Sequence, residues 1–287
     1  MGGNGNFWIA AAAAVVVLAG GIMLWFWIPF SPVKRRFRKD ISALLEESRG
    51  TAGNEIFTQE DFSHLPAAIC RYLEHCGYIG TPKMSFLKMC YHDVAFWQER
   101  NGSALRIDYL QYNFVKNPCR MALIDSRLFG IPFEGYDYYQ NGRGGMKGVI
   151  AKAITLFDQK GPKMDQACLA TFLAESLFAP SILLQDYISF EETGDYEVRA
   201  VIRYGGQTAG GIFTFNEAYE MISFTTNDRA VTKKDGSMEY IPWSAVCGEY
   251  RLSENGIRYP SKFRAVWNGS DGDFVYFDGR ISEISCG

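Results

Sequence analysis

Apolar and polar positions follow two different patterns along the chain. Residues 7–30 read FWIAAAAAVVVLAGGIMLWFWIPF and contain no charged side chain. At about 1.5 Å per residue in a helix, this run exceeds the ~30 Å hydrocarbon core of a bilayer. Aromatic residues gather at both of its ends, as is typical of the headgroup level. The pattern predicts a membrane anchor within residues 1–31.

Basic residues follow the apolar run at once. They are Lys34, Arg35, Arg36, Arg38 and Lys39. The positive-inside rule then predicts a single-pass protein of the cell membrane whose domain lies in the cytoplasm. The alternative is that these side chains bind anionic headgroups, which they can do on either face. A cleaved signal peptide is disfavoured, because its apolar stretch is only ~7–15 residues long.

Charge and cysteine usage narrow the class of protein. The chain has 29 basic and 32 acidic residues; without the five basic residues at 34–39, 24 against 32 remain, a net charge of −8. An acidic domain is a poor nucleic-acid binder, because that affinity comes mainly from basic groups on phosphates. The seven cysteines are scattered without the spacing of a disulfide framework. We expect them to be free, buried hydrophobic residues.

Helical periodicity is limited to three segments. Residues 40–49 carry a short apolar stripe, and residues 50–54 have the composition of a linker within a basic juxtamembrane segment, 32–60. Asp61 or Ser63 is expected to cap a second helix that ends at Gly77. The third helix is expected over 165–184, with Pro180 breaking or kinking it.

Period-two alternation of aromatic and β-branched residues dominates from residue 85 onward. Short strands joined by tight turns indicate an antiparallel sheet. The sequence therefore predicts an α+β fold, in which one large curved, half-barrel-like sheet with two or three packed helices forms a single domain, 61–287. The expected strands span 85–97, 104–115, 120–129, 146–158, 196–204, 211–216, 221–226, 246–252, 259–267 and 274–281.

Four segments resemble an uncharacterised bacterial family known only as a domain of unknown function. They are LPAAICRYLEHCG (65–77), YDYYQNGRGGM (136–146), LATFLAESLFAPSILL (169–184) and IPWSAVCGEYRLSENGIRYPSKFRAVW (241–267). The chain departs from the family pattern at Leu177 and Phe178, where a tryptophan is usual before the Phe-x-Pro element. The resemblance implies a shape similar to the curved, incomplete barrels of bacterial lipoprotein carriers, which enclose an apolar cavity. Fold alone does not fix function.

Candidate binding residues lie in three of these segments. The glycines at 142, 144 and 145 and the Arg143 side chain form either an anion-binding loop or a simple hairpin. Glu175, within the third helix, is either a proton acceptor or half of an ion pair, for which Arg143 is the expected partner. Aromatic residues of the last segment line a ligand cavity or fill a core. The complete set of candidates is Asp137, Tyr139, Arg143, Glu175, Trp243, Tyr250, Tyr259 and Trp267.

Other chemistry has little support in the sequence. The three histidines, His64, His75 and His92, do not combine with cysteines into the four-ligand spacing of a zinc site. We expect no metal and no cofactor. A nucleophile elbow, Gly-x-Ser-x-Gly, is missing from the sequence.

These observations favour a membrane-anchored, non-enzymatic protein that binds a lipid or another apolar ligand. One alternative is an enzyme acting on a lipid or envelope precursor through Glu175, Asp137 and Arg143. Another is a membrane-tethered scaffold whose acidic surface binds a partner protein. A hollow concave sheet face would favour the first function, and a filled one would exclude it.

Overall fold

The computed structural model describes residues 3–49, 55–233 and 236–287. Its helical elements are α1 (Gly3–Trp27), α2 (Pro32–Ser48), η1 (Glu60–Phe62), α3 (Ala67–Cys76), α4 (Pro162–Ala174), η2 (Ser176–Phe178) and η3 (Pro180–Ile182). Its strands are β1 (Phe86–Phe96), β2 (Leu105–Phe114), β3 (Cys119–Leu128), β4 (Ile131–Gln140), β5 (Arg143–Ile150), β6 (Ile154–Lys160), β7 (Ile188–Gly194), β8 (Glu197–Tyr204), β9 (Gln207–Phe215), β10 (Met221–Thr226), β11 (Ala230–Thr232), β12 (Met238–Tyr240), β13 (Trp243–Leu252), β14 (Arg258–Gly269) and β15 (Gly272–Cys286).

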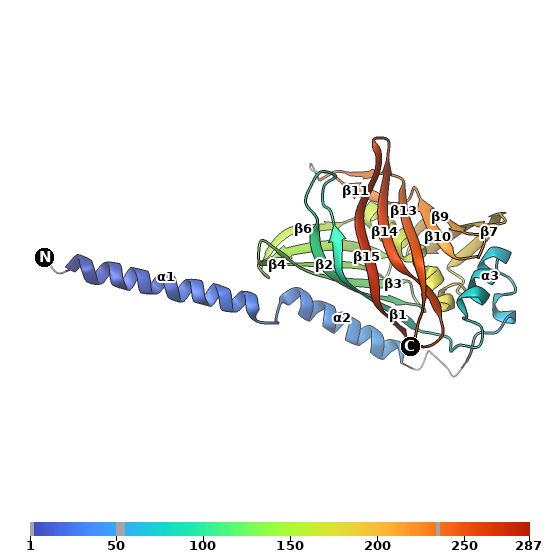
Figure 1. Ribbon diagram of the computed structural model, residues 1–287, viewed down its shortest axis with the longest axis horizontal. Helices are drawn as coiled ribbons and strands as arrows, with labels where there is room; N and C mark the ends of the chain where they lie inside the picture. The colour runs from blue at the N-terminus through green and yellow to red at the C-terminus, as the bar shows by residue number, and fades with distance from the viewer. Residues whose placement is uncertain (1–2, 50–54, 234–235) are drawn as a thin grey trace.

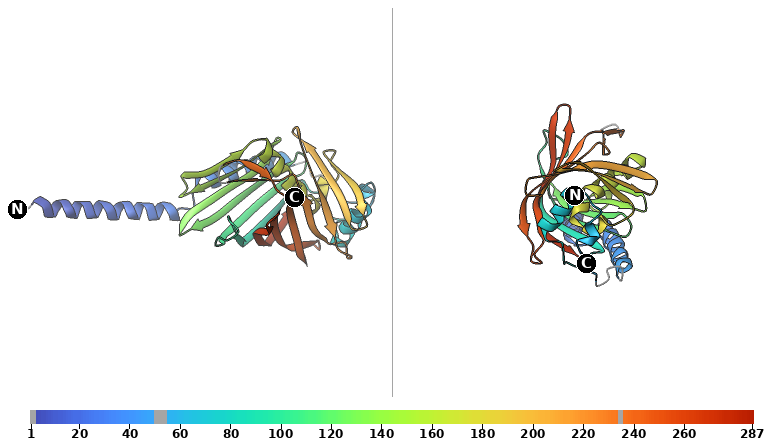
Figure 2. Two further views of the ribbon diagram at one scale, coloured as in Figure 1. Left: turned by 90° about the horizontal axis from the view of Figure 1, so that it is seen from above. Right: turned by 90° about the vertical axis from the view of Figure 1, so that its right-hand side faces the viewer.

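Thirteen of the strands form one curved antiparallel sheet. Their order is β6-β5-β4-β3-β2-β1-β15-β14-β13-β10-β9-β8-β7, so the first and last strands of the chain pair at its middle. Figure 2 shows the two halves of the sheet folding toward each other. The hairpin turns of the two halves meet, because a Cβ on Gly142 would lie only 2.7 Å from the Cα of Gly205. The predicted α+β fold with a large curved sheet is confirmed.

Helix α4 lies inside the curve and contacts both halves of the sheet. It packs mainly on β5 from one half and on β9 from the other. The predicted apolar face of this segment is fully buried, and it includes Leu169, Phe172 and Leu173. One central helix thus supplies part of the core for both halves of the sheet.

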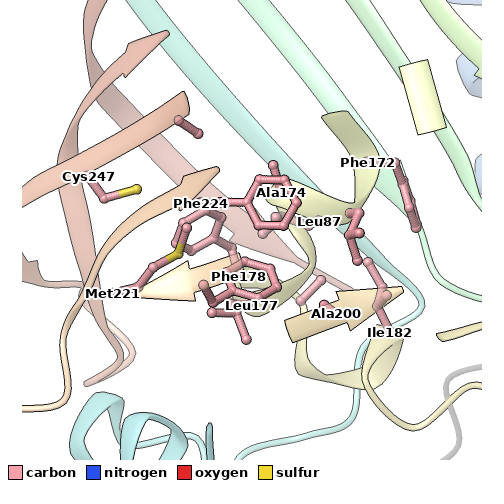
Figure 3. Close-up of a cluster of buried hydrophobic side chains, with 14 of the residues drawn as sticks. Leu87, Phe172, Ala174, Leu177, Phe178, Ile182, Ala200, Met221, Phe224 and Cys247 are labelled. Atoms are coloured by element: carbon pink, nitrogen blue, oxygen red, sulfur yellow. The ribbon is translucent and has the colours of Figure 1, made fainter. Parts of the chain in front are cut away.

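The packed core occupies the half of the curve beyond the end of α4. Figure 3 shows the short helices η2 and η3 placing Leu177, Phe178 and Ile182 against strand residues such as Phe224 and Met221. All five side chains are buried. Burying a side chain of this kind contributes about 1.5–3 kcal/mol, so this half of the curve is well stabilised.

Helix α1 extends away from the domain, whereas α2 lies against it (Figure 1). Helix α1 is long and apolar enough to cross a membrane, and none of that apolar stretch is buried against the domain. Helix α2 begins at the cap Ser31, whose Oγ accepts a hydrogen bond from the Lys34 N–H. It buries Val33, Phe37 and Ile41 against the outer face of β2, β3 and β4. The chain after α1 is therefore fixed to the sheet.

Several local predictions were wrong for identifiable reasons. Neither Asp61 nor Ser63 caps the second helix, whose cap is Pro66, because the Asp61 carboxylate instead accepts hydrogen bonds from Thr58 and Lys83. The strand expected over 146–158 is two strands, separated by a turn in which Ala151 and the next residue have positive φ. The helix expected to reach residue 184 ends at Ala174 and continues as two 3-10 turns.

Further differences concern β4, β7 and the β11–β12 ribbon, none of which was among the expected strands. The predicted linker, 50–54, lies outside the described residues. The other expected strands all have an observed counterpart within a few residues of the predicted bounds.

Candidate functional site

A cavity of about 790 Å³ separates α4 from the concave face of the sheet. Strands β1 to β6 and β13 to β15 contribute to its wall, together with the β11–β12 ribbon. Much of the wall is aromatic or aliphatic, and Tyr91, Phe133, Phe263 and Phe277 are among its residues. The volume lies within the 300–1,000 Å³ that is usual for ligand pockets. The concave face is therefore hollow here and packed around η2 and η3.

One face of α4 looks into this cavity. Its lining residues recur at three- and four-residue intervals and include Met164, Ala167, Cys168, Thr171 and Glu175 just after the last turn. This spacing places them on one side of a helix. Because the opposite side is buried in the core, α4 lacks a solvent-facing polar stripe, and its cavity face is uncharged until Glu175.

The polar centre of the cavity wall is a buried arginine on β3. The Nε of Arg120 donates to Glu175 Oε2 at 3.0 Å and Oε1 at 3.2 Å, and its Nη1 donates to Asp137 Oδ2 at 2.7 Å. Its Nη2 donates to Tyr109 Oη at 2.6 Å and to Gln111 Oε1 at 3.2 Å. Only about 5% of the arginine side chain is exposed. Its planar fork can make this many charge-assisted contacts at once, which a lysine cannot.

Two side chains of β2 complete the cluster. Gln111 Nε2 and Asn113 Nδ2 donate to Glu175 Oε2 at 2.6 and 2.9 Å, and Gln111 Nε2 also donates to Asn113 Oδ1. Residues two apart on a strand share a face, so both amides point inward. We call Arg120, Glu175, Asp137, Tyr109, Gln111 and Asn113 the arginine cluster.

The arginine cluster holds one cation and two carboxylates. Asp137 uses Oδ2 for Arg120, and its Oδ1 has the Cys168 thiol 4.0 Å away. About a fifth of the Asp137 side chain remains exposed. Its Oδ1 therefore presents a negatively charged acceptor at the cavity wall.

Burial and these charges set the protonation states around the cluster. Burial acts to lower the pKa of Arg120, but Glu175, Tyr109 and Asp137 outweigh it, so this pKa lies well above its usual range. Burial raises the pKa of the Tyr109 hydroxyl. Burial, reinforced by Asp137, likewise raises the pKa of the Cys168 thiol. At neutral pH Cys168 is therefore a protonated thiol and a poor nucleophile.

Two tryptophans form an aromatic clamp in another part of the wall. The guanidinium of Arg229 lies 4.4 Å from the ring centre of Trp243 and 5.4 Å from that of Trp267. Tyr276 stacks on Trp267 and accepts a hydrogen bond from Trp243 Nε1 at 3.0 Å. Cation–π contacts of this kind hold both the ring planes and the cation in place.

Metal-binding geometry is missing from the described part of the chain. Among residues 3–49, 55–233 and 236–287, no three His, Cys, Asp or Glu side chains are grouped so that they could hold an ion.

A family model covers most of the domain. Residues 55–279 match a family of unknown function, DUF6544. The chain belongs to the DUF6544 family. The predicted membership in a family of unknown function is confirmed, and no curated protein matches the sequence.

Two solved structures show a distant likeness to the DUF6544 protein. The first is a domain from Vibrio parahaemolyticus whose description names an outer membrane lipoprotein-sorting protein; it has 8% identity and a TM-score of 0.38 over 70% of this chain and 85% of that one. The second is a DUF1329 family protein from Desulfovibrio piger, with 11% identity and a TM-score of 0.42 over 81% of this chain and 94% of that one. At these values neither neighbour bears on function.

Four of the eight candidate site residues line the cavity of the DUF6544 domain. Asp137 and Glu175 converge on Arg120, and Trp243 and Trp267 form the aromatic clamp. The two tryptophans are direct partners on adjacent strands. Their contact with a ligand stays a prediction.

The other aromatic candidates are not among the cavity-lining residues. Tyr139 is fully buried on the strand that carries Asp137, and its hydroxyl finds no partner among the described residues. The Tyr250 hydroxyl donates to the Met221 carbonyl at 2.9 Å, and Tyr259 packs on the core. These two tyrosines lie on the same strands as the tryptophans, toward the opposite ends.

The expected pairing of Arg143 with Glu175 was wrong. Arg143 Nη1 instead donates to Asp165 Oδ2 at 3.0 Å, and the Gly144 N–H donates to Asp165 Oδ1 at 2.7 Å. Asn141 and Gly142 both have positive φ, as a two-residue hairpin requires. The glycine-rich segment is thus a hairpin, and the anion that its N–H and arginine bind is a carboxylate of the chain itself.

Sequence reasoning missed Arg120, Gln111 and Asn113. Arg120 lies between apolar neighbours on a strand, where it has no local motif. A signal was nevertheless present on β2, because the polar pair at 111 and 113 falls on the inward face of the strand, in line with Ile107 and Tyr109. Two polar residues on a buried face call for a buried partner.

Proposed function

We propose that this protein is held at a membrane by α1 and binds a lipid or another apolar ligand in the cavity beneath α4. The observation that supports this proposal is the cavity itself, a hollow of about 790 Å³ beside an otherwise well-packed core. Empty apolar space lowers stability because its lining loses packing contacts. A ligand that fills the cavity would recover them.

The composition of the cavity wall supports an apolar ligand with one polar end. Aromatic and aliphatic side chains supply the larger part of the lining, and the arginine cluster supplies a localised polar region. Within that region Asp137 Oδ1 has only the long contact from the Cys168 thiol among the described residues, so it can accept a further hydrogen bond from a hydroxyl or ammonium group. Pockets with an apolar body and a few oriented polar groups bind ligands of this kind.

Membrane attachment rests on the apolar run of α1 and the position of that helix. It projects from the domain with its apolar side chains exposed, and such a surface is stable in a bilayer and not in water (Figure 1). The basic residues that follow α1 favour a cytoplasmic domain.

Ligand binding is tested by filling the cavity. Ala265 lies on β14 and lines the cavity, so Ala265→Trp would place a bulky indole inside it. The control is Ala218→Trp, at an exposed turn between β9 and β10. Detergent-purified full chains are extracted with organic solvent and analysed by mass spectrometry, then titrated with a pyrene-labelled long-chain alcohol, whose hydroxyl suits the acceptor at Asp137.

The wild type and Ala218→Trp should retain the same apolar compound or bind the probe, and Ala265→Trp should retain or bind several-fold less. If all three proteins behave alike, or if none retains or binds an apolar compound, the proposed ligand site is wrong.

A second candidate is an enzyme that acts on a lipid or envelope precursor. The observation in its favour is that Asp137 and Glu175 meet in the cavity, although Arg143 is not among the lining residues. Both carboxylates are already bound by Arg120, which favours a structural role. Turnover of the retained compound by the wild type, lost in Asp137→Asn, would favour the enzyme.

A further inference from the structure

Two hairpin turns of the sheet lie against the domain end of α1. They are the β3–β4 turn, with Phe129 and Gly130, and the β5–β6 turn, with Ala151 and Lys152. All four residues have positive φ, a conformation that tight hairpin turns commonly use. Figures 1 and 2 show this end of the sheet facing α1, at the opposite end of the domain from α3.

Direct contacts tie the β5–β6 turn to the end of α1. Trp25 Nε1 donates to the Ala151 carbonyl at 3.1 Å, and Lys152 Nζ donates to the carbonyls of Trp25 and Ile28 at 2.7 and 2.5 Å. A lysine at this position satisfies carbonyls that have no partner within the helix, and it complements the negative end of the helix dipole.

The β3–β4 hairpin is tied to the same region. The guanidinium of Arg127 lies 5.5 Å from the ring centre of Trp27. On the other side of the junction, Lys34 Nζ contacts Asp125 Oδ2 at 2.5 Å. The turns and the end of α1 are therefore held together by contacts on both hairpins and on α2.

Exposed apolar side chains gather at this end of the sheet. Phe129 is 96% exposed at the tip of its turn, and Trp27 is 76% exposed. On the edge strand β6, Ile154 and Leu156 are exposed beside the turn, whereas the exposed residues farther along are Asp158 and Lys160. At about 3.3 Å per strand residue, the apolar surface gives way to a charged one about 13 Å from the turn.

We propose that the β3–β4 and β5–β6 turns are seated in the interfacial layer of the bilayer that holds α1, with Phe129, Ile154 and Leu156 in contact with lipid. This rests on the proposed membrane anchor and does not depend on ligand binding. Trp25 and Trp27 mark the headgroup level of a spanning α1, and the contacts above place both turns at that level. An apolar tip that gives way to charge over ~13 Å suits an interfacial depth of about 5–10 Å.

The same contact bears on the cavity. Phe157 and Gln159 of β6 line it, so the strand that meets the bilayer is also a wall of the cavity. The cavity is thereby held beside the membrane surface at a fixed orientation.

Photocrosslinking in phosphatidylethanolamine–phosphatidylglycerol vesicles tests the contact on the full chain. The photoreactive residue p-benzoylphenylalanine is placed singly at position 129, at position 16 within α1, or at position 196. Tyr196 is the matched control, because it is an exposed aromatic residue at the β7–β8 turn, and β7 is the opposite edge of the sheet.

Positions 16 and 129 should give phospholipid adducts, several-fold more than position 196. Adducts at position 16 with none above control at position 129 would overturn the interfacial contact and leave the anchor intact. A lack of adducts at position 16 would overturn the anchor itself, and the contact with it.

Discussion

Removing Arg120 should destabilise the domain more than removing any other single charge in the cavity wall. The Arg120→Met variant keeps an unbranched apolar side chain but removes every donor to Glu175, Asp137, Tyr109 and Gln111. It leaves two carboxylates, 12% and 21% exposed, without their cation.

The magnitude follows from this geometry. Breaking a buried ion pair by removing one partner costs about 3–5 kcal/mol, because the remaining charge loses its compensation without regaining water. Two carboxylates are affected, and Glu175 keeps the Gln111 and Asn113 amides as donors, so we expect the upper part of that range. For a domain of this size, about 4–5 kcal/mol corresponds to a fall in Tm of roughly 8–20 °C.

The assay is thermal and urea unfolding of the full chain in detergent, followed by circular dichroism. A rescue variant with two added substitutions separates lost charge compensation from lost packing. Adding Glu175→Gln and Asp137→Asn to Arg120→Met removes both uncompensated charges, so most of the lost stability should return. If the triple variant is no more stable than Arg120→Met, or if Arg120→Met costs less than about 1 kcal/mol, the cluster does not act as an electrostatic unit.

Three further predictions concern other parts of the domain. Gly142→Ala should lower the free energy of unfolding by about 1–3 kcal/mol, because φ is positive there and the added Cβ would meet the Gly205 backbone. Gly130→Ala, where φ is also positive but nothing lies near the added Cβ, should lower it by about 1 kcal/mol. Urea unfolding midpoints measure both changes. The hydrogen bond from Lys83 lowers the pKa of Asp61 from 3.8 to about 2. Asp61→Asn should therefore lower the free energy of unfolding by about 1 kcal/mol at neutral pH. The difference in stability between wild type and variant should vanish as the pH falls from about 4 to about 2. Burial raises the pKa of both the Cys168 and the Cys286 thiol, but only Cys286 is exposed. Brief alkylation of the native chain should therefore label Cys286 and spare Cys168, as peptide mapping would show.

The sequence predicts strands well where alternation and turn residues coincide. The strand expected over 104–115 is observed at Leu105–Phe114, because Leu105, Ile107 and Tyr109 alternate with other residues and turns lie on both flanks. β7 escaped prediction because its residues Glu191, Glu192 and Thr193 are polar on an exposed edge. The helix over 165–184 was predicted too long, because its apolar run continues into the core through the turns of η2 and η3.

The candidate site was only half predictable, for a different reason. Asp137, Glu175 and the tryptophans stood out as individual residues, but what organises the two carboxylates is a cation on another strand. Arg120 meets Asp137 and Glu175 across 17 and 55 residues of sequence. Strand β3 lies beside both β2 and β4 because of how the strands pair in the sheet. The sequence alone does not show which strands pair or in which register.

The two ends of α4 explain why a cavity persists in a domain that is otherwise densely packed. Near its start, the Asp165 carboxylate accepts a hydrogen bond from the Gly144 N–H. Because Gly144 has no side chain, the helix approaches β5 so closely that a Cβ on Gly144 would lie 2.7 Å from the Cys168 Cβ. At its end, Glu175 is bound instead by Arg120, a long side chain that reaches across from β3.

One end of α4 therefore touches the sheet backbone, and the other is held away from it by the length of an arginine. Movement of α4 into the cavity would have to break the charge-assisted hydrogen bonds of the buried Arg120 guanidinium. Each of these is about twice as strong as a hydrogen bond between neutral groups. The arginine cluster thus acts as a spacer as well as a polar wall, and the cavity volume is a property that the sequence maintains through Gly144 at one end of α4 and Arg120 at the other.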